Sequence, residues 1–326
     1  KAHVHCVILG LSQRPPQLKR LYSYSSLRSE PTMEECSSIS PYLFNASGLN
    51  RPNLVVKESG EPINGAPKIV VGSKPIDNGH YIFEPEEAKA FLLLEPQAAS
   101  FLRPYIGSHE LINGKQRYIL CLQSAAPDDL TSMVHVKERV RLVRNFRLGS
   151  NSKATRALAA TPTNFHVNVL PTDLFLAFPK VSSERRDYLP IAFLNPPIVP
   201  SDLVQVFQSA SVWHFAVLTS RIHMAWLRAI GGRLKSDYRY TIGIVYNTFP
   251  WPKATEQQKA KIEALGQAVL DARAAHPNST LADLYDPISM PPNLRKAHAA
   301  LDDAVDKLYR PSGFSSDAER VEHLLN

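Results

Sequence analysis

The charged side chains of residues 231–252 are those whose types and spacing best suit recognition chemistry. The stretch reads GGRLKSDYRYTIGIVYNTFPWP, and its charged and apolar residues alternate. A period of two is typical of a half-buried strand, in which same-side residues lie roughly 6.6 Å apart. The pattern therefore predicts one exposed strand. Its charged side holds Arg233, Lys235, Asp237 and Arg239, and its other side holds Leu234, Tyr238, Tyr240, Ile242, Ile244 and Tyr246.

Lys235 and Asp237 supply a hydrogen-bond donor and an acceptor that suit one base pair. In the major groove of DNA, a lysine donates to the acceptors of guanine, and an aspartate accepts from the amino group of cytosine. Neighbouring on one face, the two side chains are candidates for reading a single G·C pair. Arg233 and Arg239 flank them and suit phosphates or another guanine. The alternative is a solvated strand face with a cross-strand salt bridge.

A second basic group follows a helical pattern. Apolar residues recur at helical spacing at Met133, Val136, Val140 and Val143,. The other faces of this predicted helix are rich in Lys and Arg, which indicates either a solvated surface or sequence-independent, salt-sensitive contact with phosphates. Both interpretations stay open. The candidate DNA-backbone contacts are Lys137, Arg141, Arg144, Arg147, Lys153 and Arg156, with Arg233 from the other stretch.

Two motifs imitate catalytic sites. Residues 195–198 (NPPI) resemble the Asn-Pro-Pro-aromatic loop with which amino-methyltransferases hold a flipped base, but Ile198 replaces the aromatic residue. No Gly-x-Gly turn is present to hold S-adenosylmethionine, so an ordinary turn is favoured. Asp77 with Glu87 and Lys89 imitates a metal-dependent nuclease, yet Glu87 and Lys89 fall in the first turns of a predicted helix. We therefore predict no catalytic, cofactor or metal-binding residue in this chain.

Composition indicates the surroundings of the protein. Lys and Arg exceed Asp and Glu by seven among 326 residues, a surplus that suits an acidic partner such as nucleic acid,. Cys6, Cys36 and Cys121 are far apart and form no CxxC pair, which predicts a reducing cytoplasm,. The apolar run near the start is too short to cross a bilayer. Since the chain begins within an apparent strand and without Met, we expect a fragment or a processed product.

The remaining patterns predict an α+β fold. Residues 4–11 read as a buried strand, and a boundary is expected near residues 28–40,. Residues 209–230 are apolar on most sides, which predicts a buried helix ended by Gly231 and Gly232 in left-handed dihedrals. A capping box of Thr255 with Gln258 begins a C-terminal helical pair. Further strands are expected over residues 68–72, 117–122, 174–178 and 189–194, and a further helix from Pro85.

Six stretches together resemble the C-terminal part of the MmeI-like restriction-modification enzymes. These are single polypeptides that join a nuclease, an adenine-specific DNA methyltransferase and a target-recognition domain. The resemblance spans nearly the whole chain. It rests on residues 3–10 (HVHCVILG), 68–79 (KIVVGSKPIDNG), 101–107 (FLRPYIG), 181–190 (VSSERRDYLP), 223–240 (HMAWLRAIGGRLKSDYRY) and 245–252 (VYNTFPWP).

The resemblance implies a domain plan. Residues 1–30 would be the terminal strand of the methyltransferase domain with a linker. Residues 31–252 would form a target-recognition domain with a mixed sheet and a buried helix, and residues 253–326 a C-terminal helical segment. The variable base-reading positions of the family follow a Gly-Arg-Leu tripeptide, which places them here at Lys235 and Asp237, with Arg239 a further candidate.

The same resemblance implies a function. It predicts sequence-specific recognition of double-stranded DNA for an adenine-specific methyltransferase or restriction enzyme. The second partner would be the upstream methyltransferase domain of the same polypeptide, with or without a nuclease. S-adenosylmethionine would then bind the parent enzyme and not this chain. Two alternatives stay open: the chain is itself an S-adenosylmethionine-dependent methyltransferase, or it is a protein-interaction module.

Overall fold

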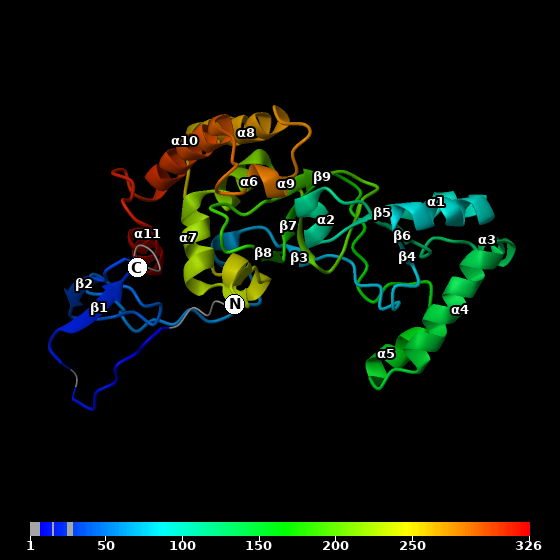
Figure 1. Ribbon diagram of the computed structural model, residues 1–326, viewed down its shortest axis with the longest axis horizontal. Coiled ribbons are helices and arrows are strands. Elements are labelled where there is room, and N and C mark those ends of the chain that lie inside the picture. Colours follow the sequence, from blue (N-terminus) through cyan, green and yellow to red (C-terminus); the bar gives the residue numbers. More distant parts are fainter. Residues whose placement is uncertain (1–6, 15, 25–28) are drawn as a thin grey trace.

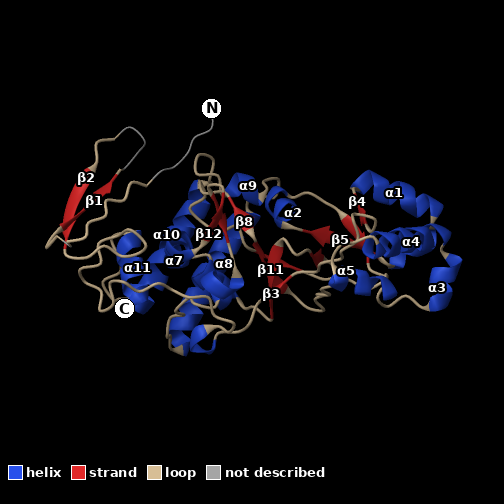
Figure 2. Ribbon diagram, turned by 90° about the horizontal axis from the view of Figure 1, so that it is seen from below, coloured by secondary structure: helices blue, strands red, loops and turns tan. Residues whose placement is uncertain are grey.

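The chain forms a molecule that is elongated along one axis (Figure 1). The computed structural model describes residues 7–14, 16–24 and 29–326. A β-hairpin lies at one end, a central lobe with most of the helices follows, and a distal lobe lies at the other end. Figure 2 shows the larger sheets in the middle of the molecule, between the C-terminal helices and those of the distal lobe.

The distal lobe is built on a mixed four-stranded sheet with the order β10-β5-β6-β4, in which only β10 and β5 run parallel. Its helices include α1, which begins as predicted at Pro85, with Glu86 and Glu87 in the first turn near the positive end of the helix dipole,. The strands are β4 (Ile82–Phe83), β5 (Leu102–Ile106), β6 (Tyr118–Leu120) and β10 (Val199–Pro200). The helices are α1 (Pro85–Leu94), α3 (Pro127–Ser132), α4 (Val134–Leu148) and α5 (Lys153–Ala157).

The central lobe combines two sheets with the remaining helices. One sheet has the order β3-β11-β7-β9, and a smaller one has the order β12-β13-β8. The strands are β3 (Val70–Val71), β7 (Phe175–Pro179), β8 (Val181–Ser182), β9 (Ala192–Leu194), β11 (Val204–Gln208), β12 (Gly232–Leu234) and β13 (Asp237–Arg239). The helices are α2 (Ser108–Asn113), α6 (Val212–Leu218), α7 (Arg221–Ile230), α8 (Glu256–Ala274), α9 (Leu281–Leu284), α10 (Pro292–Tyr309) and α11 (Asp317–Leu325). The predicted α+β class is confirmed.

The predicted buried helix over residues 209–230 is buried but interrupted. α6 ends before Thr219, and α7 starts after Ser220, whose backbone is extended (φ −76°, ψ 161°). The Ser220 hydroxyl donates to the Val217 carbonyl at 2.6 Å, a local hydrogen bond that competes with continued helix,. The predicted end is also different in detail, because Gly231 is extended (φ −67°, ψ 149°) and not left-handed. A Cβ on Gly231 would lie 2.4 Å from the Leu227 carbonyl oxygen, which explains the need for glycine there.

The C-terminal helical pair is confirmed. α8 packs along α10, and both bury the apolar stripe that the sequence predicts. The capping box is present: the Thr255 amide donates to Gln258 Oε1 at 2.9 Å, and the Gln258 amide donates to Thr255 Oγ1 at 3.3 Å. Two satisfied amides at the first turn fix where α8 starts. α9 and α11 complete this region.

The first residues differ from the prediction. Residues 4–6 lie outside the described part of the chain, and residues 7–11 are exposed and form no strand. Among the described residues, no strand pairs with residues 7–11, and no backbone hydrogen bond of these residues is found. Instead, β1 (Lys19–Ser23) pairs antiparallel with β2 (Thr32–Cys36), and this hairpin projects from the central lobe (Figure 1). The predicted buried strand is therefore wrong for residues 7–11.

Asp302 is a buried carboxyl where α10 meets α7. Its oxygens accept hydrogen bonds from the Tyr188 hydroxyl at 2.7 Å and from the Arg221 amide at 2.8 Å. Burial nevertheless raises the pKa of Asp302 to about 6, because it disfavours the charged form,. The pKa of an unfolded aspartate is about 3.9. Asp302 therefore favours folding below about pH 4, and this contribution is lost as the pH rises through 6.

This sign gives a testable pH dependence. We expect Asp302→Asn, which does not ionise, to gain unfolding free energy relative to wild type by up to about 3 kcal/mol between pH 4 and pH 7. Urea denaturation at a series of pH values measures the difference. Asp303→Asn, at an exposed neighbouring position on α10, is the matched control and should show no comparable gain. A difference between Asp302→Asn and wild type that is constant with pH would contradict the prediction.

Candidate nucleic-acid interface

The charged stretch forms a hairpin and not one long strand. β12 and β13 pair antiparallel, with Leu234 opposite Asp237, so Lys235 and Ser236 form a two-residue loop. After Arg239 the chain leaves the sheet and enters a π-helical turn over Ile242–Tyr246. The predicted continuous strand is wrong because its pattern of alternation passes through a turn. Ser236 in the loop and Asp237 directly after it are the residues that indicate a turn, since both residue types favour turns.

A two-residue loop also changes which side chains share a face. Because paired residues of an antiparallel ladder lie on the same face, Leu234 shares a face with Asp237, and Arg233 shares a face with Tyr238,. Asp237 and Arg239 remain on one face, since they are two residues apart on β13. Arg233 is on the other face. The predicted row of four charges is therefore wrong.

Arg233 lies against the hairpin. Its guanidinium carbon is 4.1 Å from the centroid of the Tyr238 ring, a cation–π contact,. The same side chain donates to the Ser236 carbonyl at 3.3 Å, at the loop itself. Arg233 is exposed, but these contacts favour a role in holding the loop.

Lys235 occupies the tip of the hairpin. Its φ is 58°, in the left-handed region that residues other than Gly, Asn and Asp seldom adopt,. The side chain is exposed, and no hydrogen bond or ion pair of Lys235 is found among the described residues. A strained backbone that presents a free ammonium group is a feature that often marks functional positions.

Asp237 is half-buried beside the loop that follows β8. Its Oδ1 accepts a long hydrogen bond of 3.4 Å from the Glu184 amide. Burial lowers the pKa of the nearby Arg186 guanidinium, and the charges of Asp237 and Asp286 oppose that shift. None of the ion pairs formed by the described residues includes Lys235, Asp237 or Arg239. The cross-strand salt bridge of the alternative interpretation is therefore not formed.

Arg239 is exposed at the end of β13, between Gly232 of β12 and Val181 of β8. The structure thus brings Asp237 and Arg239 onto one face, with Lys235 at the tip beside them. The sequence does not predict that the Glu184 amide and the Arg186 guanidinium lie near Asp237, because the hydrogen bond between Glu184 and Asp237 joins residues 53 positions apart.

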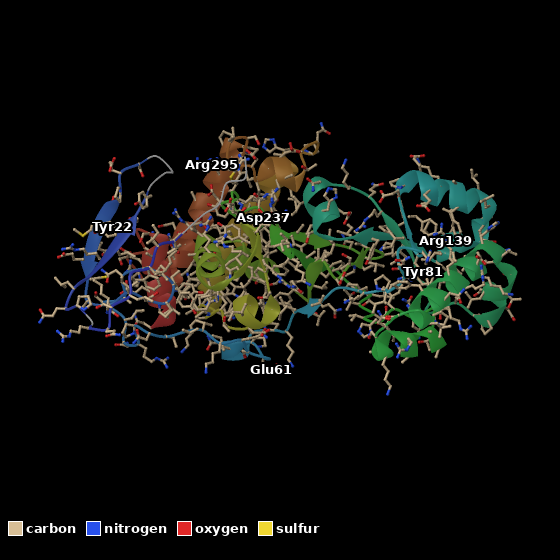
Figure 3. All side chains as sticks on the ribbon, turned by 60° about the horizontal axis from the view of Figure 1, so that its bottom comes forward. Tyr22, Glu61, Tyr81, Arg139, Asp237 and Arg295 are labelled. Atoms are coloured by element: carbon tan, nitrogen blue, oxygen red, sulfur yellow. The ribbon has the colours of Figure 1, made fainter. Side chains whose placement is uncertain are left out.

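The basic helix is α4, in the distal lobe. Figure 3 places Asp237 in the central lobe and Arg139 of α4 in the distal lobe, so the two candidate surfaces are separate. Exposed residues on α4 and α5 keep the phosphate-contact prediction open: Lys137, Arg141, Arg144, Lys153 and Arg156. Arg141 pairs with Glu138 at 2.6 Å, and Arg156 donates to the Ser150 carbonyl at 2.7 Å.

Arg147 contradicts its prediction as a phosphate contact. It is fully buried (0% exposed). Its guanidinium donates to five backbone carbonyls at 2.8–3.1 Å, those of Pro75, Ile76, Leu158, Thr161 and Asn164. The helical spacing indicates this burial, because residue 147 follows Val143 by four positions and continues the apolar stripe. Arg147 is therefore a structural residue.

The two motifs that imitate catalytic sites, at residues 195–198 and at Asp77 with Glu87 and Lys89, make ordinary structural contacts. The Ile198 amide donates to the Asn195 carbonyl at 3.2 Å, which closes a turn. Asp77 accepts a hydrogen bond from the Tyr81 amide at 2.9 Å, and Lys89 pairs with Glu86 at 2.8 Å. Within the described residues, no group of three or more His, Cys, Asp or Glu side chains is placed to hold a metal ion. The helices described here include none with the length and apolarity to cross a membrane.

Comparison with known proteins covers both parts of the chain. Residues 50–253 match the family described as MmeI, target recognition domain, and residues 254–326 match the family described as MmeI, C-terminal domain. DNA methyltransferase A of Bacillus subtilis (strain 168) is 37% identical over 296 residues, which are 91% of this chain and 33% of that protein.

A solved structure is similar over nearly the whole chain. It is that of the type IIL restriction-modification enzyme MmeI in complex with DNA, with a TM-score of 0.88 and 36% sequence identity. The match covers 95% of this chain and 41% of that chain. The chain thus spans less than half the length of either relative.

Proposed function

Since the chain belongs to the MmeI family, by its target recognition and C-terminal domains, we propose that it recognises a specific sequence in double-stranded DNA. The observation that carries the proposal is the β12–β13 hairpin. The major groove, about 12 Å wide, admits a two-stranded β-ribbon. Here such a ribbon presents an exposed cation at its tip and a carboxylate beside it.

The hairpin tip would read one G·C pair. The Lys235 ammonium donates to the O6 and N7 atoms of guanine, and the Asp237 carboxylate accepts from the N4 amino group of cytosine. Asp237 retains this capacity, because a carboxylate has about four acceptor positions and the Glu184 amide uses one,. Arg239, on the same face as Asp237, reaches a second guanine or a phosphate.

The exposed basic residues of α4 and α5 would hold the DNA backbone from the distal lobe. Contacts with phosphates fix the position of a protein on the duplex but carry no sequence information. The proposed contacts are Lys137, Arg141, Arg144, Lys153 and Arg156. Reading by one lobe and backbone contact by the other would divide specificity and affinity between two surfaces.

The wider protein would be an adenine-specific DNA methyltransferase or restriction enzyme, with this chain positioning the target adenine for base flipping. S-adenosylmethionine would supply the methyl group in a methyltransferase domain of the same polypeptide. The sequence holds no Gly-x-Gly turn of the kind that binds this cofactor,, which supports the proposal that the cofactor binds outside this chain. We therefore assign no catalytic step to the residues of this chain.

Selection from a pool of random duplexes tests the proposed function. We expect the protein to enrich one sequence that contains at least one required G·C pair. Five phosphate contacts predict a loss of affinity of about 500-fold between 50 and 200 mM salt, from a slope of roughly −0.9 per contact. Absence of affinity for any duplex at low salt would leave a protein-interaction module. Calorimetric binding of S-adenosylmethionine by this chain would contradict the cofactor assignment.

A further inference from the structure

Arg228, in the last turn of α7, joins three parts of the central lobe. Its Nε donates to the Tyr238 hydroxyl at 3.2 Å, and its Nη1 donates to Asp317 Oδ2 at 2.8 Å. Its Nη2 donates to the carbonyls of Arg186 and Asp187 at 3.4 and 3.3 Å. One planar guanidinium therefore contacts β13, the loop after β8 and the start of α11. Only an arginine presents five donors in such a fixed fork.

Asp317 anchors the far side of this group. It is the first residue of α11, where a carboxylate interacts favourably with the helix dipole,. Besides Arg228 it accepts a hydrogen bond from Arg221 Nε at 3.0 Å. Since Arg221 and Arg228 are two turns apart on α7, they hold the same carboxylate from one helix face.

The hairpin needs this anchor, because its own pairing is short. β12 and β13 share three residue pairs, and β13 is joined to β8 by only two. Two-stranded ribbons of this length are marginal without packing against other elements. Tyr238 provides that packing: it is buried on the face opposite Asp237, and its ring supports Arg233.

We propose that Arg228 is a positioning residue for DNA sequence recognition, an inference that rests on the proposed function. Through the Tyr238 hydroxyl it fixes the orientation of β13 and so of Asp237 and Arg239. Through the Arg186 and Asp187 carbonyls it fixes the loop whose Glu184 amide contacts Asp237. Asp317 at the start of α11, 89 residues along the chain from Arg228, thereby helps to set the angle at which the hairpin meets DNA.

Two substitutions test the proposal, one that removes a single hydrogen bond of Arg228 and one that removes its guanidinium. Tyr238→Phe removes the hydroxyl but keeps the ring beneath Arg233, so the fold is retained. Arg228→Lys keeps a cation near Asp317 but loses the fork. With the sequence selected by wild type, we expect Tyr238→Phe to weaken binding about tenfold and Arg228→Lys at least as much. Binding to a duplex of unrelated sequence should change less than twofold.

Arg221→Ala is the matched control. It removes another arginine from Asp317. The Arg221 side chain is about half exposed (51%), and among the described residues its hydrogen bond and ion pair go to Asp317 and not to the hairpin. We expect it to keep the wild-type ratio of selected to unrelated affinity. All variants are compared well below their melting temperatures, because a loss of discrimination in a fully folded protein is not explained by stability.

The outcomes separate this proposal from the proposed function. If wild type selects a sequence and both Tyr238→Phe and Arg228→Lys keep full discrimination, the positioning role is overturned and DNA recognition stands. An equal loss in Arg221→Ala would also overturn it, by assigning the effect to Asp317 alone. A wild-type protein without sequence preference overturns both.

Discussion

Replacement of Arg147 by methionine is expected to lower the free energy of unfolding by about 3–5 kcal/mol. The five carbonyls that Arg147 contacts belong to the turn before β4 and to residues 158–164. Methionine fills part of the space but has no donor, and each buried carbonyl left without a partner costs about 1–3 kcal/mol. Relaxation toward water recovers some of that sum. Urea denaturation followed by circular dichroism measures the difference.

Arg144→Ala is the control for this prediction. Arg144 lies one turn earlier on α4 and is exposed. We expect its unfolding free energy to stay within about 0.5 kcal/mol of wild type. Its DNA affinity should fall, and the slope of log affinity against log salt should decrease by about 1. If Arg147→Met instead kept full stability and lost DNA affinity, Arg147 would return to the phosphate contacts.

The contrast between these two arginines shows what the sequence of α4 could predict. Residue type argued for exposure of Arg147, whereas its position on the Val136, Val140 and Val143 stripe argued for burial. The prediction from helical position is correct, because Arg147 is buried. The sequence could not show why a charge is tolerated there, because Ile76, one of its acceptors, lies 71 residues away along the chain.

The errors in the candidate site also arise where local patterns do not determine the structure. Helices such as α8 follow from local periodicity and caps, and they were predicted closely. A period of two, however, is shared by one long strand and by the two strands of a hairpin. The Lys235 backbone has a positive φ, which a lysine does not predict because Gly, Asn and Asp are the residues typical of such positions,. Arg233, on the strand before the loop, therefore lies on the opposite face from Asp237 and Arg239, which keep their common face as predicted.

Exchange of Lys235→Glu together with Asp237→Arg is expected to turn a preference for G·C into one for C·G at one recognition position. Each good base contact contributes roughly 1–3 kcal/mol of discrimination, and the exchange reverses donor and acceptor at both residues. Selection from random duplexes, with wild type in parallel, measures the preference. Glutamate suits the exposed tip. At position 237, arginine meets the desolvated Arg186, so we expect weaker affinity for every duplex as well.

Single substitutions distinguish reversal from simple loss. Lys235→Glu alone removes the guanine donor and leaves two carboxylates at the tip, so it should lose the preference for G·C without gaining one for C·G. Asp237→Arg alone should lose affinity without reversal, because Lys235 still requires a guanine acceptor. Reversal only in the double variant would assign both residues to one base pair. A folded double variant that selects the wild-type sequence would remove Lys235 and Asp237 from base reading and leave Arg239 as the remaining candidate on that face.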